Sequence, residues 1–263
     1  MPEHIDLTKE EFGGESFTIG ETTYTTSDLF ISSTNSFIFN IDKKEPSRDI
    51  AQILKVSARP IDAATLTLLF PKLDLAAKEE ILSNGGVVDI NDSFFYSKRR
   101  RIKDIIDPLL SEDKMYAIRF LLELISLNNI AQFSPDNPNI VRAVPKVIFL
   151  KGNMNNIHMS FMMDKIDEDK NLKDEFKRIN NLFSKKAKLN ATKILINNLI
   201  NIGDSLDMIS TMPDDVVHRD IKLQNIIVNK KNPNYSPLVL GDFGLALINQ
   251  DSIGSALGSP IFV

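Results

Sequence analysis

The stretch VVHRDIKLQNIIV, residues 216–228, decides how the rest of the chain is interpreted. It places Asp220, Lys222 and Asn225 at relative positions 0, +2 and +5, inside a frame of valine and isoleucine. Because valine and isoleucine are usually buried, the frame predicts a loop held by buried neighbours, with its polar side chains fixed in direction. Another acidic residue, Asp242, follows in LGDFGLA at the end of an apolar run. The 22 positions between the two aspartates leave room for two short strands joined by a turn.

These side chains supply the groups that phosphoryl transfer from a nucleotide needs. Such a reaction depends mainly on positioning and on neutralising charge in a loose transition state. Asn225 and Asp242 carry hard oxygen ligands of the kind that Mg²⁺ binds together with phosphates. Asp220 can orient an incoming hydroxyl and accept its proton, and Lys222 can steady the transferring phosphoryl group. An isolated aspartate is more often a capping or turn residue, but that interpretation does not explain the whole set.

The motifs then point to a family. HRDIKLQN has the form HRDxKxxN, and DFGLA, which includes Phe243 and Gly244, has the DFG form. On these motifs the chain resembles the eukaryotic-type serine/threonine protein kinase family. A further stretch, SALGSP at 255–260, resembles the segment that ends the family's activation loop, and it holds Ser255 and Ser259. Three motifs in the expected order and spacing are far more specific than one.

The resemblance implies an α+β fold with two lobes. It also implies transfer of the γ-phosphate of ATP to a hydroxyl of a protein substrate, with ATP and Mg²⁺ as cofactors. A β-rich N-lobe is expected over residues 1–163, with a long insertion at about 58–110, followed by a helical C-lobe over 164–263. This C-lobe is expected to be incomplete, because the family's domain continues beyond the activation segment. We therefore expect an exposed apolar surface along the helix at 191–209, through which the chain associates.

The same resemblance assigns residues upstream. The family places a lysine on a strand, where it pairs with phosphates and with a helix glutamate. Lys55 in the apolar run ILKVS fits this role, because a charge in such a strand needs a partner. Glu123 in FLLELISL is the preferred glutamate, since the following NPNIV resembles the turn after the family's helix. Glu80, which is nearer to Lys55 in the sequence, is the alternative.

The resemblance also implies where the nucleotide binds. The loop that covers the phosphates corresponds to SSTNSFIF at 32–39, with Ser33 and Ser36 as its small polar residues. The family's loop is glycine-rich so that backbone amides approach the phosphates closely, and this stretch contains no glycine. Met163 corresponds to the residue that gates the adenine pocket, and Ile53 stands where the family usually has alanine.

Three consecutive residues, Asp164, Lys165 and Ile166, correspond to the hinge whose backbone hydrogen-bonds the base. His218 corresponds to a residue that the family uses for packing and backbone hydrogen bonds. Arg219 implies control by phosphorylation of the activation loop, where a phosphate would give the arginine an anionic partner. Ser255 is the expected phosphorylation site by its position.

Periodicity and turn residues predict the main elements. Four strands are expected, at 36–41, 49–56, 146–150 and 157–163. A helix is predicted to begin after an N-cap at Ser111 and to end near Leu127. Apolar residues at helical spacing predict another helix that is capped by Asn190 and reaches Ile209. The turn KKNPNYS at 230–236 is expected to join the two short strands between the aspartates.

Composition excludes several classes of protein. The formal charge of −4 argues against a dedicated nucleic-acid binder. The chain has no cysteine, which excludes disulfides and thiolate zinc sites, and only three histidines. The acidic N-terminus does not resemble a secretory signal peptide, and no apolar stretch is long enough to span a bilayer. We expect a cytoplasmic protein, unless an export signal of another kind is present.

Two other functions stay open at this stage. The chain could be a pseudokinase or a truncated, kinase-like interaction module, which the glycine-free loop and the incomplete C-lobe favour. It could also be a small-molecule kinase on the same fold, which Lys222 and the SALGSP stretch disfavour. The basic run KRRRIK at 98–103 is either a docking patch or, as short charge runs usually are, a solvated loop.

Overall fold

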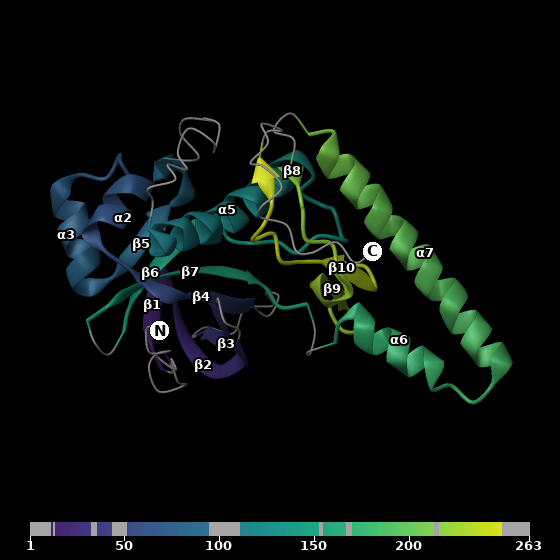
Figure 1. Cartoon of the computed structure of the whole chain (residues 1–263). Helices are drawn as coiled ribbons and strands as arrows, with labels where there is room; N and C mark the ends of the chain where they lie inside the picture. The colour runs from purple at the N-terminus through teal and green to yellow at the C-terminus, as the bar shows by residue number, and fades with distance from the viewer. Residues whose placement is uncertain are drawn as a thin grey trace. The chain divides into compact units, whose positions relative to one another are not determined.

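The computed structural model of the chain describes residues 12, 14–32, 36–43, 52–94, 111–152, 155–166, 170–212 and 216–248 (Figure 1). Four expected features lie outside these residues: Ser33, the basic run at 98–103, Ser255 and Ser259.

The chain divides into two compact units. The first contains Met1–Arg100, Asp104–Leu121 and Ala143–Asp164. The second contains Arg101–Lys103, Leu122–Arg142 and Lys165–Val263. The expected lobes at 1–163 and 164–263 stay a prediction.

An antiparallel sheet forms the first unit. Its strands are β1 (Ser16–Ile19), β2 (Thr22–Ser32), β3 (Ser36–Lys43), β4 (Gln52–Ile61), β5 (Gly86–Asp89), β6 (Lys146–Lys151) and β7 (Ile157–Asp164). Their order is β1-β2-β3-β4-β7-β6-β5. All four predicted strands are present, as β3, β4, β6 and β7. With the five α-helices of the described residues, this sheet makes the fold α+β, as expected.

The segment that was expected to be an insertion contributes to this sheet within its described residues. It contains α2 (Ala63–Leu69), α3 (Leu75–Asn84) and the edge strand β5, which pairs with β6. Gly85 ends α3 in the left-handed region, with a φ of 76°, and a Cβ on it would lie 2.4 Å from the carbonyl oxygen of Phe149. Only glycine fits such a turn without strain, so this residue permits the chain to pass directly from α3 into the sheet.

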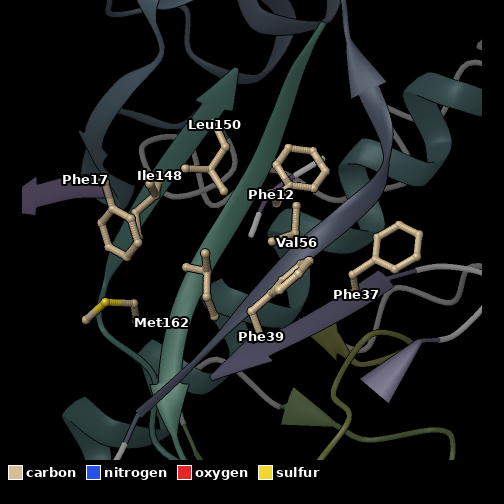
Figure 2. Close-up of a cluster of buried hydrophobic side chains, with 9 residues drawn as sticks. Phe12, Phe17, Phe37, Phe39, Val56, Ile148, Leu150 and Met162 are labelled. Carbon is tan, nitrogen blue, oxygen red and sulfur yellow. The ribbon is translucent and has the colours of Figure 1, made fainter. Parts of the chain in front are cut away.

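One face of the sheet is covered by an aromatic and aliphatic core. Figure 2 shows side chains from several strands of the sheet meeting Phe12 there. The buried members of this core are Phe12, Phe17, Phe37, Phe39, Leu54, Val56, Ile148, Leu150 and Met162. Residues of one strand alternate between faces, so Leu54 and Val56 point into this core and Lys55 points to the opposite face.

The opposite face carries helix α5 (Glu112–Phe133), whose residues up to Leu121 belong to the first unit. Lys55 lies directly across from Phe161 in the antiparallel pair β4–β7. Residues that pair in this way share a face. The ring centroid of Phe161 lies 5.2 Å from that of Phe120 in α5. Lys55 therefore lies on the face of the sheet that α5 covers.

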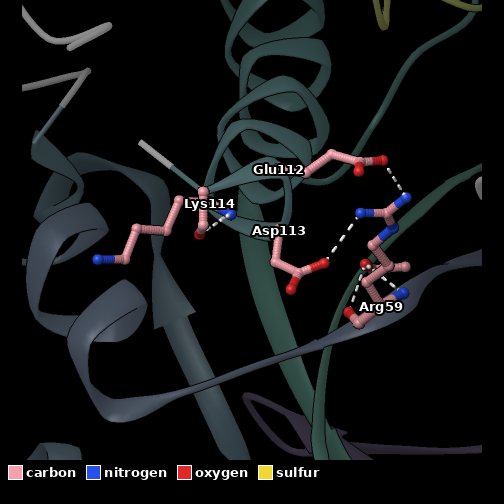
Figure 3. Close-up of polar contacts among 6 residues, drawn as sticks. Arg59, Glu112, Asp113 and Lys114 are labelled. Atoms are coloured by element: carbon pink, nitrogen blue, oxygen red, sulfur yellow. Dashed lines mark hydrogen bonds and ion pairs between the residues drawn. The ribbon is translucent and has the colours of Figure 1, made fainter. Parts of the chain in front are cut away.

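Arg59 of β4 anchors the beginning of α5 (Figure 3). Its guanidinium donates to Glu112 Oε1 at 2.6 Å and to Asp113 Oδ1 at 2.9 Å. It also lies 5.2 Å from the ring centroid of Tyr116. The predicted cap is confirmed, because the backbone N–H of Lys114 donates to Ser111 Oγ at 3.4 Å. The helix ends at Phe133, beyond the predicted end near 127.

The second unit continues from α5 into helices and short strand pairs. Its elements are α6 (Leu172–Asn180), α7 (Lys185–Ser210), β8 (Val216–Val217), η3 (Leu223–Asn225), β9 (Ile226–Val228), β10 (Leu238–Leu240) and β11 (Leu247–Ile248). The two short strands predicted between the aspartates are confirmed as the antiparallel pair β9–β10. Asn229 holds their turn, since its Nδ2 donates to the carbonyls of Asn232 and Tyr235 at 2.8 and 2.9 Å.

The predicted start of the long helix is wrong. Asn190 lies inside α7, which begins at Lys185 after an N-cap at Ser184. The hydroxyl of Ser184 accepts from the backbone N–H of Ala187 at 3.4 Å. The residues between this cap and Asn190 are mostly lysine, alanine and leucine, which favour helix strongly, so the helix extends back to the earlier cap.

No helix within the described parts of the chain is long and apolar enough to cross a membrane.

Candidate active site

Two strand pairs bring the two predicted loops together. The loop 218–225 runs from β8 to β9, and the loop 241–246 runs from β10 to β11. Because β8 pairs with β11 and β9 pairs with β10, the two loops start and end side by side. The backbone N–H of Gly241 also donates to the carbonyl of Asn225 at 2.9 Å, which joins the loops directly.

Asp220 is the centre of the first loop. Its buried carboxylate accepts from Lys222 Nζ at 2.6 Å, through Oδ2. Asn225 Nδ2 donates to the same oxygen at 3.0 Å and to the backbone carbonyl of Asp220 at 2.9 Å. The nitrogen of the Asn225 amide thus faces Asp220, so its oxygen lies on the opposite side of Cγ. The three residues predicted to act together are in direct contact.

His218 connects the two loops. Its Nε2 lies 3.0 Å from the carbonyl oxygen of Gly241, and its Nδ1 lies 3.3 Å from the backbone N–H of Asp220. A carbonyl only accepts, so Nε2 donates and Nδ1 accepts. The ring also packs against Phe243, with centroids 4.5 Å apart. Both nitrogens are therefore used in holding the loops.

Burial lowers the pKa of His218 below its ordinary value. The carbonyl of Gly241 and the carboxylates of Asp242 and Asp220 oppose that shift. Because both carboxylates raise the pKa of His218, they lie near its imidazole. The net direction keeps His218 neutral at neutral pH, as the two hydrogen bonds require.

Two residues of the site adopt a backbone conformation that is rare outside glycine. Arg219 has a φ of 64° and Asp242 has a φ of 60°. The left-handed region costs an L-residue about 1–2 kcal/mol, so surrounding contacts must hold it. Such residues cluster at functional sites. Each of these two adjoins a residue that the loop contacts described above hold in place.

Gly244 lies close to two carboxylates of the second unit. A Cβ on this residue would lie 3.4 Å from Asp242 Oδ1 and 3.5 Å from Glu123 Oε2. Glu123 is buried, on the part of α5 that belongs to the second unit. Glu80, the alternative partner of Lys55, is instead exposed on α3 and accepts from Asn84 Nδ2 at 2.9 Å. The pairing of Lys55 with Glu123 stays a prediction.

The residues expected to contact ATP are divided between the units. Ser36 lies on the same sheet face as Lys55, because Ile38 pairs with Lys55 and Ser36 is two residues away on the strand. Met163 pairs with Ile53 on that face, and Asp164 pairs with Gln52. Ile166 is buried in the second unit. Their roles in nucleotide binding stay predictions.

Asn225 and Asp242 are the residues of this site that could hold a metal ion. Among the described residues, no group of three or more His, Cys, Asp or Glu side chains could hold a metal ion. Mg²⁺ usually takes only one or two protein carboxylates and completes its shell with phosphates and water. An exposed carboxylate at Asp242 and the oriented amide oxygen of Asn225 are donors of this kind.

Two parts of the site were not predicted. One is the pairing of β8 with β11, which closes the loops at their outer ends. The other is Gly241, which joins the loops through both its N–H and its carbonyl. A Cβ on Gly241 would lie 3.3 Å from Ile227 Cδ1, so glycine is suited to this close approach. The only signal in the sequence is a glycine directly before an aspartate at the end of an apolar run.

Comparison with known proteins finds a local similarity to kinases. The chain is 34% identical over 65 residues to the serine/threonine-protein kinase DCLK1 of Rattus norvegicus and of Mus musculus. The match covers 25% of this chain but only 14% of the rat protein and 8% of the mouse protein. No protein-family profile matches the chain. The chain thus has a kinase-like relationship over part of its length.

Proposed function

We propose that the chain is an ATP- and Mg²⁺-dependent protein serine/threonine kinase, or part of one. The observation that carries this proposal is the contact set of Asp220, Lys222 and Asn225, which the paired strands hold beside the loop of Asp242. The local similarity to serine/threonine-protein kinases supports the same activity.

In the proposed reaction, the hydroxyl of a protein substrate attacks the γ-phosphorus of ATP. A bond forms between the hydroxyl oxygen and phosphorus, the bond from phosphorus to the bridging oxygen breaks, and ADP leaves. Asp220 orients the hydroxyl and accepts its proton. Lys222, with its ammonium 2.6 Å from Asp220 Oδ2, is close enough to steady the negative charge of the transferring group.

The metal donors of the proposal are the Asn225 amide oxygen and the Asp242 carboxylate. When bound to these two residues, Mg²⁺ would neutralise the negative charge of the phosphates. Asn225 is suited to this role because its amide nitrogen is engaged by Asp220, which fixes the direction of its oxygen. The left-handed backbone at Asp242 fixes the direction in which its side chain leaves the loop.

Lys55 and Glu123 are proposed to bind the phosphates as an ion pair. Glu123 follows Glu112 by 11 positions, which is about three helical turns and leaves the two residues within about 20° of each other around α5. Glu112 is held by Arg59, which lies four residues beyond Lys55 on β4. Glu112 and Glu123 therefore lie on the same side of α5. The pairing of Glu123 with Lys55 is proposed on the resemblance to the kinase family.

The experiment is phosphate transfer to a generic protein acceptor, measured with the Asp220→Asn variant. Removing the base should lower turnover by about two to four orders of magnitude. Asp136→Asn is a matched control, since Asp136 is an exposed aspartate of the same unit outside the site. Undiminished turnover in Asp220→Asn, with an unchanged far-UV circular dichroism spectrum, would remove Asp220 from the mechanism.

The non-catalytic alternative predicts a different outcome. An interaction module would show no transfer by the unmodified chain, even where ATP with Mg²⁺ raises its melting temperature. The expected loop over the phosphates, at 32–39, favours this alternative because it contains no glycine. A thermal shift with ATP and Mg²⁺ that is lost in Asp242→Asn, without any transfer, would support it.

A further inference from the structure

Helix α7 is apolar on two opposite sides. One side is buried in the second unit through Leu195, Ile202 and Ile209. The other side exposes Leu189, Ile196 and Ile200, with relative exposures of 55%, 52% and 55%. These three are spaced by seven and four residues, so they form one straight stripe along the helix. A helix that is apolar on both sides normally has both sides covered.

The stripe extends to Gly203, where another helix can approach the backbone closely. Residues of opposite charge flank the stripe. Gly203 is exposed one turn beyond Ile200, and a Cβ on it would meet nothing within 4 Å. Its backbone is therefore open to a neighbouring helix. Lys193 lies beside the first half of the stripe and Asp204 beside the second half, and both are exposed. At 100° per residue, both lie within about 60° of the stripe, on the same edge.

We propose that this stripe of α7 binds the same stripe of a second copy of the chain, as an antiparallel helix pair with two-fold symmetry. A two-fold axis near residue 198 sets Ile196 opposite Ile200 of the other copy. It also sets Lys193 opposite Asp204, and symmetry produces this ion pair twice. A parallel two-fold pair would instead place this edge of the two copies on opposite sides of the interface, so neither charge would face an opposite charge. The order of charges along the helix is therefore complementary to that of an antiparallel copy.

The proposal does not depend on kinase activity. It rests on the apolar stripe, on the open backbone at Gly203, and on a charge order that is complementary only to itself in reverse. A different occupant of the stripe has no need of Lys193 and Asp204 at symmetric positions. The test is therefore designed so that charge and apolar contact are changed separately.

The first measurement is sedimentation equilibrium of the 263-residue chain and of its Ile196→Lys variant. Burying a lysine at the centre of the interface should weaken dimerisation by at least about a hundredfold. Ile194→Lys is the matched control, because Ile194 is 63% exposed on the same helix but points about 160° away from Ile196. It should leave the dissociation constant unchanged. If both variants weaken dimerisation equally, the association is non-specific and the proposal is overturned.

The second measurement swaps charges. Lys193→Glu or Asp204→Lys alone creates two repulsive contacts in the pair and should weaken dimerisation about tenfold. The double variant restores both pairs, and so does a mixture of the two single variants, which should form a mixed dimer. A double variant that stays as weak as the single ones would overturn the antiparallel arrangement. A wild-type chain that stays monomeric at about 100 µM would overturn the whole proposal, and would leave the stripe to another occupant.

Discussion

Within the described residues, each unit buries a histidine against a phenylalanine, and the two pairs are closely alike. In the first unit, His158 of β7 places Nδ1 2.9 Å from the carbonyl of Ser57, and its ring centroid lies 5.1 Å from that of Phe12. In the second, His218 places Nε2 3.0 Å from the carbonyl of Gly241 and packs on Phe243. Burial lowers the pKa of both histidines.

The difference lies in the surroundings of the ring. His218 also accepts the backbone N–H of Asp220, and two carboxylates near it oppose the fall in its pKa. For His158, the opposing cause among the residues that the structure describes is the carbonyl of Ser57. Burial and packing are therefore the same for a histidine that joins two strands and for one that holds the two loops of the candidate site. His218 is distinguished by the hydrogen bond that its second ring nitrogen, Nδ1, accepts from the backbone N–H of Asp220.

The largest effect is expected when each histidine is replaced by alanine. Each change leaves a cavity and an unpaired buried carbonyl, and should lower the free energy of unfolding by about 2–4 kcal/mol. Only His218→Ala should also lower turnover, by about ten- to a hundredfold, since it releases the backbone of Asp220. Amide hydrogen exchange reports the stability of each unit separately, and phosphate transfer is measured at a temperature where both variants remain folded.

Each of the two histidine variants is the control for the other. If His158→Ala lowers turnover as much as His218→Ala at equal stability, the two histidines have the same role and the comparison fails. If neither variant changes turnover, then His218 only packs the loops and does not fix the position of Asp220.

The loop around His218 was predictable from sequence because its contacts are local. Asp220 meets Lys222 and Asn225 within five residues, so their spacing alone indicates the contact. The hairpin β9–β10 follows from two short apolar runs and a turn. The pairing of β8 with β11 joins segments about thirty residues apart, and two-residue strands carry no periodicity that could reveal it.

The first unit shows the complementary case. Its strands β3, β4, β6 and β7 were predicted from apolar runs separated by turn residues, but their order in the sheet is a property of distant pairing. Nothing in the local sequence of Gly86–Asp89 indicates that it adds an edge strand beside β6. In the second unit, helix α6 was missed, although Asn171 caps it by accepting from the backbone N–H of Asp174 at 3.3 Å.

A smaller effect is expected from pH. In the unfolded chain both histidines have a pKa near the ordinary value of about 6.5, and in the fold both pKa values are lower. The unfolded state therefore binds more protons as the pH falls below about 6.5, and the stability that is fully present above this pH is lost towards the folded pKa values. Each histidine should contribute a slope of up to about 1.4 kcal/mol per pH unit. Denaturant unfolding followed by circular dichroism between about pH 5.5 and 7.5 measures the total slope.

The variant His158→Asn isolates one contribution. An asparagine amide can still donate to the carbonyl of Ser57 but does not titrate. The total slope in this pH range should therefore fall by the contribution of His158, while that of His218 should persist. An unchanged total slope would mean that His158 takes up a proton within the fold.

The smallest effect is expected from the two phenylalanines. Phe12→Leu and Phe243→Leu each keep an apolar side chain but remove the ring that packs on histidine, at 5.1 and 4.5 Å between centroids. Each should lower the free energy of unfolding of its own unit by about 1 kcal/mol, which hydrogen exchange can measure. Phe243→Leu should in addition lower turnover, because Phe243 fixes the ring that holds both the backbone of Asp220 and Gly241. A Phe243→Leu variant with unchanged turnover would show that the two hydrogen bonds of His218 are sufficient to position the loops without the aromatic contact.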